Sequence, residues 1–400
     1  MSEQLLELHD LSFVPEGEEV LVGRVETGSY AVFPVDGAEL LRRIADGMTL
    51  DQAATWYEDR FGEPVDVAEF AETLADLGFI REPGADRQIV QPVRLRWLGR
   101  AGFSPLAWIL YGSIFAGWVF AVARDNAVLP HPSQIFFTES LVAVQVGLTL
   151  SQLPLLFLHE GFHILAGRRL GLPSRLRVSN RLTYLVFETQ LNGLMSVPRN
   201  ARYLPFVAGM LLDGLAVCSL GLVAELTRLA SGSFSLAGRF CLAAAFTVVL
   251  RMGWQCLLYL RTDLYYVFAT ALNCYDLHEA STALLRNRIW RALGRTGRVR
   301  DEKQWSERDR RVGTFYGPFI VLAILASCLL TAFGTFPVAR LYLVKIVHDL
   351  GTGTSGPHFW DVLVSLALNV TQVVALIWLS RRKRRAVAGR GPRLLQGKAD

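Results

Sequence analysis

The chain has 400 residues, of which 52% are hydrophobic and 19% charged, and its mean hydropathy is +0.30. These values exclude an ordinary soluble protein of this size, and their uneven distribution along the chain excludes one uniform domain. The net charge of +5 at pH 7 comes from basic segments beside apolar runs, a pattern that favours anionic lipid over nucleic acid as the partner. The five cysteines form no CxxC pair, so neither a disulfide framework nor a thiolate metal site is predicted.

The first 83 residues are charged and well mixed, and they predict a small soluble domain. The stretch EEVLVGRVETGSYAVFPV, residues 18–35, predicts a pair of strands. The segment GMTLDQAATWYEDRF predicts a helix capped by Thr49, and VDVAEFAETLADLGFI predicts a further helix that Gly78 ends. The expected fold of residues 1–83 is winged-helix-like, and residues 84–102 are expected to form a linker.

Apolar runs dominate the chain after residue 103, and six of them are long enough to cross a bilayer as helices. They cover residues 104–123, 140–167, 204–226, 239–260, 314–333 and 361–380. Arginine and lysine are concentrated before the first run, after the second, after the fourth and in the tail of residues 382–400. The positive-inside rule therefore predicts a multi-pass protein of the cell membrane with both termini in the cytoplasm. The expected fold class is mainly α, a polytopic membrane helical bundle over residues 103–381 with an N-terminal α+β domain.

The connector after the second apolar run alternates and is rich in residues that favour strands. Its sequence, SRLRVSNRLTYLVFETQ, predicts one or two strands with a turn at Ser179 and Asn180. The connector after the fourth run, which begins TDLYYVFATALNCYDL, has helical periodicity instead.

The second apolar run contains a polar cluster, HEGFH, at residues 159–163. On a helix His159 and His163 lie one turn apart on the same face, so both imidazoles can bind one zinc ion. Glu160 lies one position round, where its carboxylate can take a proton from water as that water attacks a peptide carbonyl. Ionisable groups inside a membrane span are costly and mark functional sites, so the sequence predicts a zinc hydrolase centre rather than a chance match.

Zinc requires a third protein ligand, and two aspartates compete for this role. Asp213 lies within the third apolar run, and Asp263 follows the fourth. Asp213 is expected to lie at a depth in the membrane similar to that of His159, which favours it as the third ligand. However, Arg251 lies at a similar depth in the fourth run, and a buried ion pair between Asp213 and Arg251 explains both residues without a metal. Spacing alone leaves the choice open.

The sequence HEGFHILAGRRLG, residues 159–171, resembles the second-span motif of the site-2 protease family, membrane-embedded zinc metalloproteases. In that family the third zinc ligand is an aspartate on a later span, inside an LDG or DGY-like motif. LLDG at residues 211–214 matches the short form, whereas LLYLRTDLYYVFATALNCYDL, residues 257–277, resembles the segment of the peptide-processing branch. The resemblance implies Asp263 as the third ligand of Zn²⁺, with Asp213 as the alternative.

The N-terminal pattern carries a second resemblance. A strand pair, then DGMT at residues 46–49, then DVAEFAETLADLGFI, is similar to the PqqD-like domain, which recognises leader peptides in natural-product pathways. The resemblance implies that a leader adds as a strand to the small sheet and packs against the helix of residues 65–75. The implied docking residues are Val20, Val25, Tyr30 and Phe33. A winged-helix domain used for other docking or for DNA is the alternative.

Together the two resemblances imply an intramembrane zinc metallopeptidase that matures a ribosomally made, modified peptide by removing its leader. The expected partners are a leader-bearing precursor peptide and the lipid bilayer, with no nucleic acid, and an exporter is left open as a further partner. The alternating connector would hold the substrate as an added strand through Arg177, Thr183 and Tyr184, or would simply form an edge hairpin. Regulated cleavage of a membrane-anchored protein is one alternative, and a non-catalytic peptide-binding scaffold for export or immunity is another.

Overall fold

The computed structural model describes residues 5–81, 93–181, 184–191, 193–330 and 357–388, together with positions 340, 343–344, 346–347 and 351. The chain divides into two compact units that are each built from several segments. The first unit comprises residues 1–109, 160–176 and 189–209, and the second comprises residues 110–159, 177–188 and 210–400.

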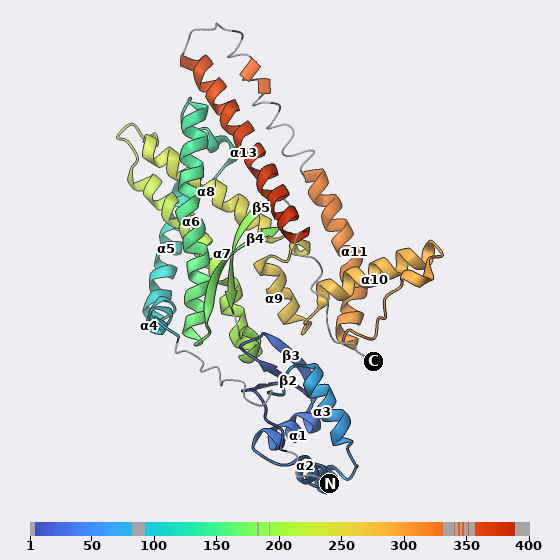
Figure 1. Cartoon of the computed structure of the whole chain (residues 1–400). Helices are drawn as coiled ribbons and strands as arrows, with labels where there is room; N and C mark the ends of the chain where they lie inside the picture. Colours follow the sequence, from blue (N-terminus) through green and yellow to red (C-terminus); the bar gives the residue numbers. More distant parts are fainter. Residues whose placement is uncertain are drawn as a thin grey trace. The chain divides into compact units, whose positions relative to one another are not determined.

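The N-terminal part of the first unit is a small α+β domain (Figure 1). Strands β1 (Ser12–Glu16), β2 (Glu19–Arg24) and β3 (Ser29–Pro34) form an antiparallel sheet in that order, so β2 is the central strand. Helices α1 (Val35–Ala45), α2 (Leu50–Phe61) and α3 (Val67–Asp76) follow. The predicted strand pair corresponds to β2 and β3. The additional strand β1 has only five residues and contains Pro15, features that weaken its strand pattern.

Local signals set the helix ends of this domain as predicted. Thr49 forms a capping box with Gln52 at the start of α2, which satisfies two backbone N–H groups of the first turn. Gly78 follows α3 with a φ of +70°, a conformation that favours glycine. The sheet, α1 and α3 share an apolar core, whose buried members are Val20, Val22, Phe33, Ala38, Leu41, Leu74 and Phe79.

Five helices of the described residues are long and apolar enough to cross a bilayer. They are α5 (Pro105–Arg124), α6 (Leu141–Arg169), α7 (Arg199–Leu226), α8 (Leu236–Gln255) and α11 (Glu307–Leu330). The sixth predicted run falls in α13 (Pro357–Ala388), where the apolar stretch Phe359–Ala375 is shorter. The prediction of a mainly helical chain is thus confirmed, and its long apolar helices are consistent with a membrane protein, while the number of spans and the orientation of the termini stay predictions.

The alternating connector forms two strands, β4 (Ser174–Arg181) and β5 (Tyr184–Leu191), which pair with each other. Ser179 and Asn180 lie inside β4, so the predicted turn at this position is wrong. Asn180 is followed by arginine rather than by glycine, and the pair therefore lacks the residue that most favours a tight turn.

The remaining described elements are short. Helix α4 (Arg96–Gly102) lies within the predicted linker, most of which falls outside the described residues. The predicted helical connector consists of α9 (Asp263–Ala271) and α10 (Leu277–Ala292), because Asn273 adopts a positive φ of 55° and separates them. Single turns of 3-10 helix are η1 (Asn126–Val128), η2 (Pro132–Ile135), η3 (Leu194–Ser196), η4 (Leu258–Leu260) and η5 (Thr296–Arg298).

Candidate metal centre

Helix α6 carries both predicted histidine ligands. It runs as one helix from Leu141 to Arg169, so His159 and His163 lie one turn apart on the same face, as predicted. His159 is 3% exposed, Glu160 is 7% exposed and His163 is 6% exposed. Polar groups buried to this degree destabilise a fold unless they are hydrogen-bonded or paired. The contacts of each side chain therefore indicate what the cluster can do.

The ring of His163 is oriented by a backbone carbonyl. Its Nδ1 atom lies 2.7 Å from the carbonyl oxygen of Pro205 in α7. Because a carbonyl oxygen can only accept, Nδ1 must carry the proton and donate it in this hydrogen bond. The lone pair of the neutral ring then lies on Nε2, which is the atom left to bind a cation.

The ring of His159 lies between the two aspartates that compete for the role of third ligand. Its Nδ1 atom is 3.0 Å from Oδ2 of Asp213, and its Nε2 atom is 3.4 Å from Oδ2 of Asp263. A histidine that binds a metal through Nε2 usually donates its Nδ1–H to a carboxylate or a carbonyl. In this geometry Asp213 occupies the orienting position and Asp263 occupies the position beside the metal-binding nitrogen.

Asp213 has a second partner, as the ion-pair interpretation predicted. Its side chain is completely buried, and both of its oxygens accept hydrogen bonds from Arg251 of α8. Arg251 also donates through Nη1 to Gln152 of α6 at 3.4 Å, and Gln152 donates to Thr247 at 2.6 Å. The predicted ion pair is therefore confirmed, and it is one part of a polar network that also reaches His159.

Asp263 is held by a different residue. Gln255, the last residue of α8, donates through Nε2 to Oδ2 of Asp263 at 3.0 Å. The Asp263 backbone N–H donates in return to Oε1 of Gln255 at 3.1 Å. This reciprocal pair fixes the carboxylate at the start of α9. The sequence analysis missed Gln255, although an amide at the end of an apolar helix eight residues before a candidate ligand is a usable signal.

The three side chains His159, His163 and Asp263 form a group that could hold a metal ion. Two imidazole nitrogens and one carboxylate oxygen are donors that suit zinc, and a catalytic zinc site has three protein ligands. The contacts of the rings agree with this donor set, because each histidine directs Nδ1 toward an acceptor and keeps Nε2 for the ion. The chemistry of the cluster therefore fits zinc.

Glu160 is positioned by the connector strand β5. Its Oε2 atom accepts hydrogen bonds from the Thr189 backbone N–H at 2.9 Å and from the Thr189 hydroxyl at 2.7 Å. Both residues belong to the first unit. The sequence analysis assigned β5 to substrate but missed Thr189, because nothing in a strand pattern indicates which threonine faces a particular carboxylate.

The predicted peptide-docking residues lie in different environments. The side chains of Val20 and Phe33 are buried in the apolar core, and the role of these two residues in leader docking stays a prediction. Their alternation along β2 and β3 turns them toward the helices. Tyr30 is half-buried, and this burial raises the pKa of its phenol. Val25 packs against Gly193, just before η3.

The predicted substrate-strand residues are only partly described. Arg177 lies in β4 and Tyr184 begins β5, whereas Thr183 lies outside the described residues, as do the side chains of the other two. Their role stays a prediction.

A buried ion pair joins the N-terminal sheet to α7 within the first unit. Arg202 Nη2 lies 2.6 Å from Glu16 Oε1, and the two side chains are 3% and 2% exposed. Arg202 also donates to the carbonyl oxygens of Val197 and Met195. Because Arg202 precedes Pro205 by three residues, the small domain is anchored about one turn from the carbonyl that orients His163.

Comparison with known proteins gives no match: no family model, no curated protein and no solved structure matches this chain. The two family resemblances therefore stay predictions, and the case for a function rests on the side chains described above.

Proposed function

We propose that this chain is an intramembrane zinc metallopeptidase that matures a leader-bearing precursor peptide, with His159, His163 and Asp263 as ligands. The observation that carries the proposal is the arrangement around His159. Its Nε2 atom faces Asp263, while its Nδ1 atom faces an aspartate already paired with arginine. A zinc site needs one aspartate as a ligand and a second acceptor that orients the histidine ring. A structural ion pair needs only one aspartate.

Each side chain of the site has a distinct part in hydrolysis. Zinc, when bound, acts as a Lewis acid that makes water nucleophilic at neutral pH. The Pro205 carbonyl holds the proton of His163 at Nδ1, and Asp213 faces Nδ1 of His159, an arrangement that keeps both Nε2 atoms basic. Thr189 holds Oε2 of Glu160 and leaves Oε1 to take the proton of the attacking water and pass it to the leaving amine.

The N-terminal domain offers a place for the leader of the substrate. Strand β2 has partners on both sides, so an added strand would pair with an outer edge of the sheet, and we assign it to β3. Phe33 of β3 packs edge to face on Phe70 of α3, with ring centroids 6.2 Å apart, so this edge runs beside the helix that the resemblance implicates. Docking there would raise the effective concentration of the scissile bond at the metal centre.

Glu160→Gln is the variant that tests the proposal. The amide keeps the shape of Glu160 but cannot take a proton, so cleavage should fall about 10²- to 10⁴-fold while zinc content stays unchanged. Purified protein in detergent would be incubated with a small precursor peptide encoded beside the gene and with a proteome-derived peptide library. New peptide ends would be identified by mass spectrometry.

Glu225→Gln serves as the matched control, because Glu225 pairs with Arg228 near the end of α7, far along the helix from Pro205. It should cleave like the parent protein. Equal cleavage by Glu160→Gln would contradict the proposed general base. Zinc binding without cleavage of any peptide would favour the scaffold, and cleavage only of substrates with their own membrane span would favour the regulated protease.

A further inference from the structure

Helix α10 and the segment that follows it carry an unusual concentration of positive charge. Between Ala280 and Arg300 there is no aspartate or glutamate, and the segment holds six arginines, Arg286, Arg288, Arg291, Arg295, Arg298 and Arg300. None of them belongs to the metal centre. Like charges packed this closely repel one another, so an anion that lay among them would stabilise the arrangement.

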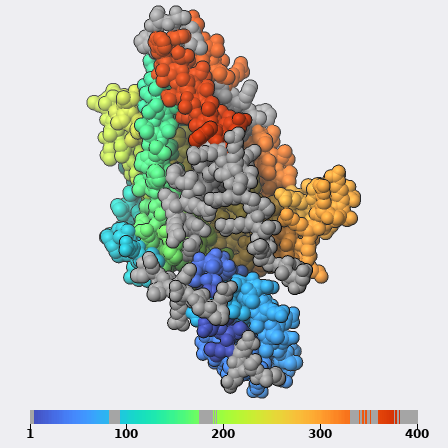
Figure 2. Space-filling model, viewed as in Figure 1, coloured from blue at the N-terminus to red at the C-terminus, as the bar shows by residue number. Residues whose placement is uncertain are grey.

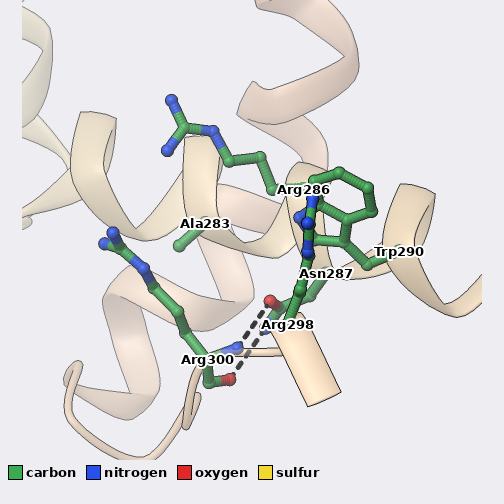
Figure 3. Close-up of a pocket in the computed structure, with 6 residues that line it drawn as sticks. All are labelled: Ala283, Arg286, Asn287, Trp290, Arg298 and Arg300. Carbon is green, nitrogen blue, oxygen red and sulfur yellow. Dashed lines mark hydrogen bonds between the residues drawn. The ribbon is translucent and has the colours of Figure 1, made fainter. Parts of the chain in front are cut away.

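A pocket of about 290 Å³ lies at this segment, between α10 and η5 (Figure 3). Its lining residues are Ala283, Arg286, Asn287, Trp290, Arg298 and Arg300. Asn287 is 1% exposed and joins the two walls, since its Nδ2 donates to the Arg300 carbonyl and its Oδ1 accepts from the Arg300 N–H. These two hydrogen bonds preform the pocket, which is large enough for a phosphate group.

The guanidinium groups at this pocket are available to a ligand. The neighbouring carboxylate, Glu302, already accepts hydrogen bonds from Asn287 and Arg291. Within the part of the chain that the structure describes, Arg286, Arg298 and Arg300 form no ion pair. The Arg298 guanidinium lies 5.0 Å from the centre of the Trp290 ring, which holds it beside the opening. Three arginines thus line the site, and among the described residues none of the three pairs with a carboxylate.

The packing of α10 places the pocket near the start of a membrane helix. Gly313 and Gly317 of α11 form a GxxxG pair, and Ser281 of α10 lies against both glycines. A Cβ atom added at Gly313 would be 3.0 Å from the Ser281 hydroxyl, so α10 crosses α11 closely at this point. The charged residues of α11 end at Arg311, immediately before the crossing, and its apolar stretch follows.

The outer surface of α10 is suited to a membrane–water interface. Figure 2 shows the end of α10 and η5, in light orange, projecting from the second unit. Ile289 and Leu293 are 49% and 61% exposed there, beside the arginines and Trp290. Exposed apolar side chains, a tryptophan and arginines on one short helix are typical of interfacial helices on anionic lipid.

We propose that this pocket binds the phosphate of an anionic phospholipid headgroup and so anchors α10 and η5 to the membrane surface. Arginine forms paired, charge-assisted hydrogen bonds to phosphate. In an anionic headgroup the negative charge of the phosphate is not balanced by a positive group of the same lipid, as it is in a zwitterionic headgroup. The inference does not depend on the metal centre, and a chain without peptidase activity would keep it.

The test compares the double variant Arg298→Gln/Arg300→Gln with Arg288→Gln/Arg311→Gln, which removes the same charge outside the pocket. Delipidated protein would be incubated with equal amounts of phosphatidylglycerol and phosphatidylcholine, and bound lipid would be measured by native mass spectrometry. Each arginine near anionic lipid contributes about fivefold in affinity, so the pocket variant should bind phosphatidylglycerol roughly 25-fold more weakly than the parent. The control removes no arginine of the pocket, so it should lose clearly less affinity for phosphatidylglycerol than the pocket variant.

Unchanged phosphatidylglycerol binding in the pocket variant would overturn the proposal, as would an equal loss in the control. Displacement of the lipid by excess inorganic phosphate would identify a site for free phosphate instead. Arg298→Lys/Arg300→Lys keeps the positive charge but loses the paired hydrogen bonds, so it should retain more lipid than the glutamine variant. This comparison shows whether the glutamine variant loses lipid because it lacks charge or because it is misfolded.

Discussion

Asp263→Ala is expected to weaken zinc binding several hundredfold, whereas Asp213→Asn is expected to weaken it only about 10- to 100-fold. A structural zinc site with four protein ligands is worth about 10–16 kcal/mol, so the loss of one ligand costs roughly 3–4 kcal/mol. Removal of a residue that merely orients a histidine has the smaller effect. Asparagine keeps an oxygen that can face Nδ1 of His159, so the ring should keep its direction in Asp213→Asn.

Zinc affinity would be measured by competition with a chelator of known affinity, on protein purified in detergent. Asp125→Asn is a suitable control, because this aspartate pairs with Arg228 and caps the start of η1, outside the metal centre. It should bind zinc as the parent does. The opposite order, with Asp213→Asn losing zinc and Asp263→Ala keeping it, would exchange the roles of the two aspartates.

Arg251→Met is expected to lower the free energy of unfolding by about 3 kcal/mol. The change leaves the completely buried carboxylate of Asp213 without its cation, and an unpaired buried charge costs about 3–5 kcal/mol. The lower end of this range applies because the Arg251 side chain is 20% exposed. Asp213→Asn/Arg251→Met removes both charges and should recover most of the loss, because a neutral pair of similar volume needs no counter-charge.

Thermal unfolding in detergent would measure this effect, with an expected decrease of about 5 °C or more in the apparent melting temperature of Arg251→Met. Arg311→Met is the matched control. Arg311 also pairs with a carboxylate, that of Glu307, but both side chains are 75% exposed, so the loss should stay below about 1 kcal/mol. A double variant as unstable as Arg251→Met would show that the methionine, rather than the unpaired Asp213, causes the loss.

Much of the fold could be predicted from the sequence because its signals are local. Apolar runs of bilayer length correspond to α5, α6, α7, α8 and α11. The cap at Thr49 and the glycine at Gly78 likewise act within a few residues of their helices. The predicted turn at Ser179 and Asn180 failed because turn propensity competes with strand pairing, which depends on a partner strand elsewhere in the chain.

In the candidate site, too, only the features with local signals could be predicted from the sequence. His159, Glu160 and His163 could be predicted, because a helix fixes the direction of residues four apart. The choice between Asp213 and Asp263 could not, because it depends on which nitrogen of His159 each aspartate faces. Gln255 lies only eight residues before Asp263, so this contact was within reach of the sequence, whereas Thr189 holds Glu160 only after β5 has folded against α6. No spacing in the sequence indicates the Thr189 contact.

The zinc content of the chain, purified without chelators, tests the central claim most directly. Elemental analysis would compare the parent protein with His159→Ala, with Asp125→Asn as the control for purification. The account predicts about one zinc ion per chain in the parent and the control, and close to none in His159→Ala. A parent protein without zinc, or a His159→Ala variant with as much zinc as the parent, would contradict it.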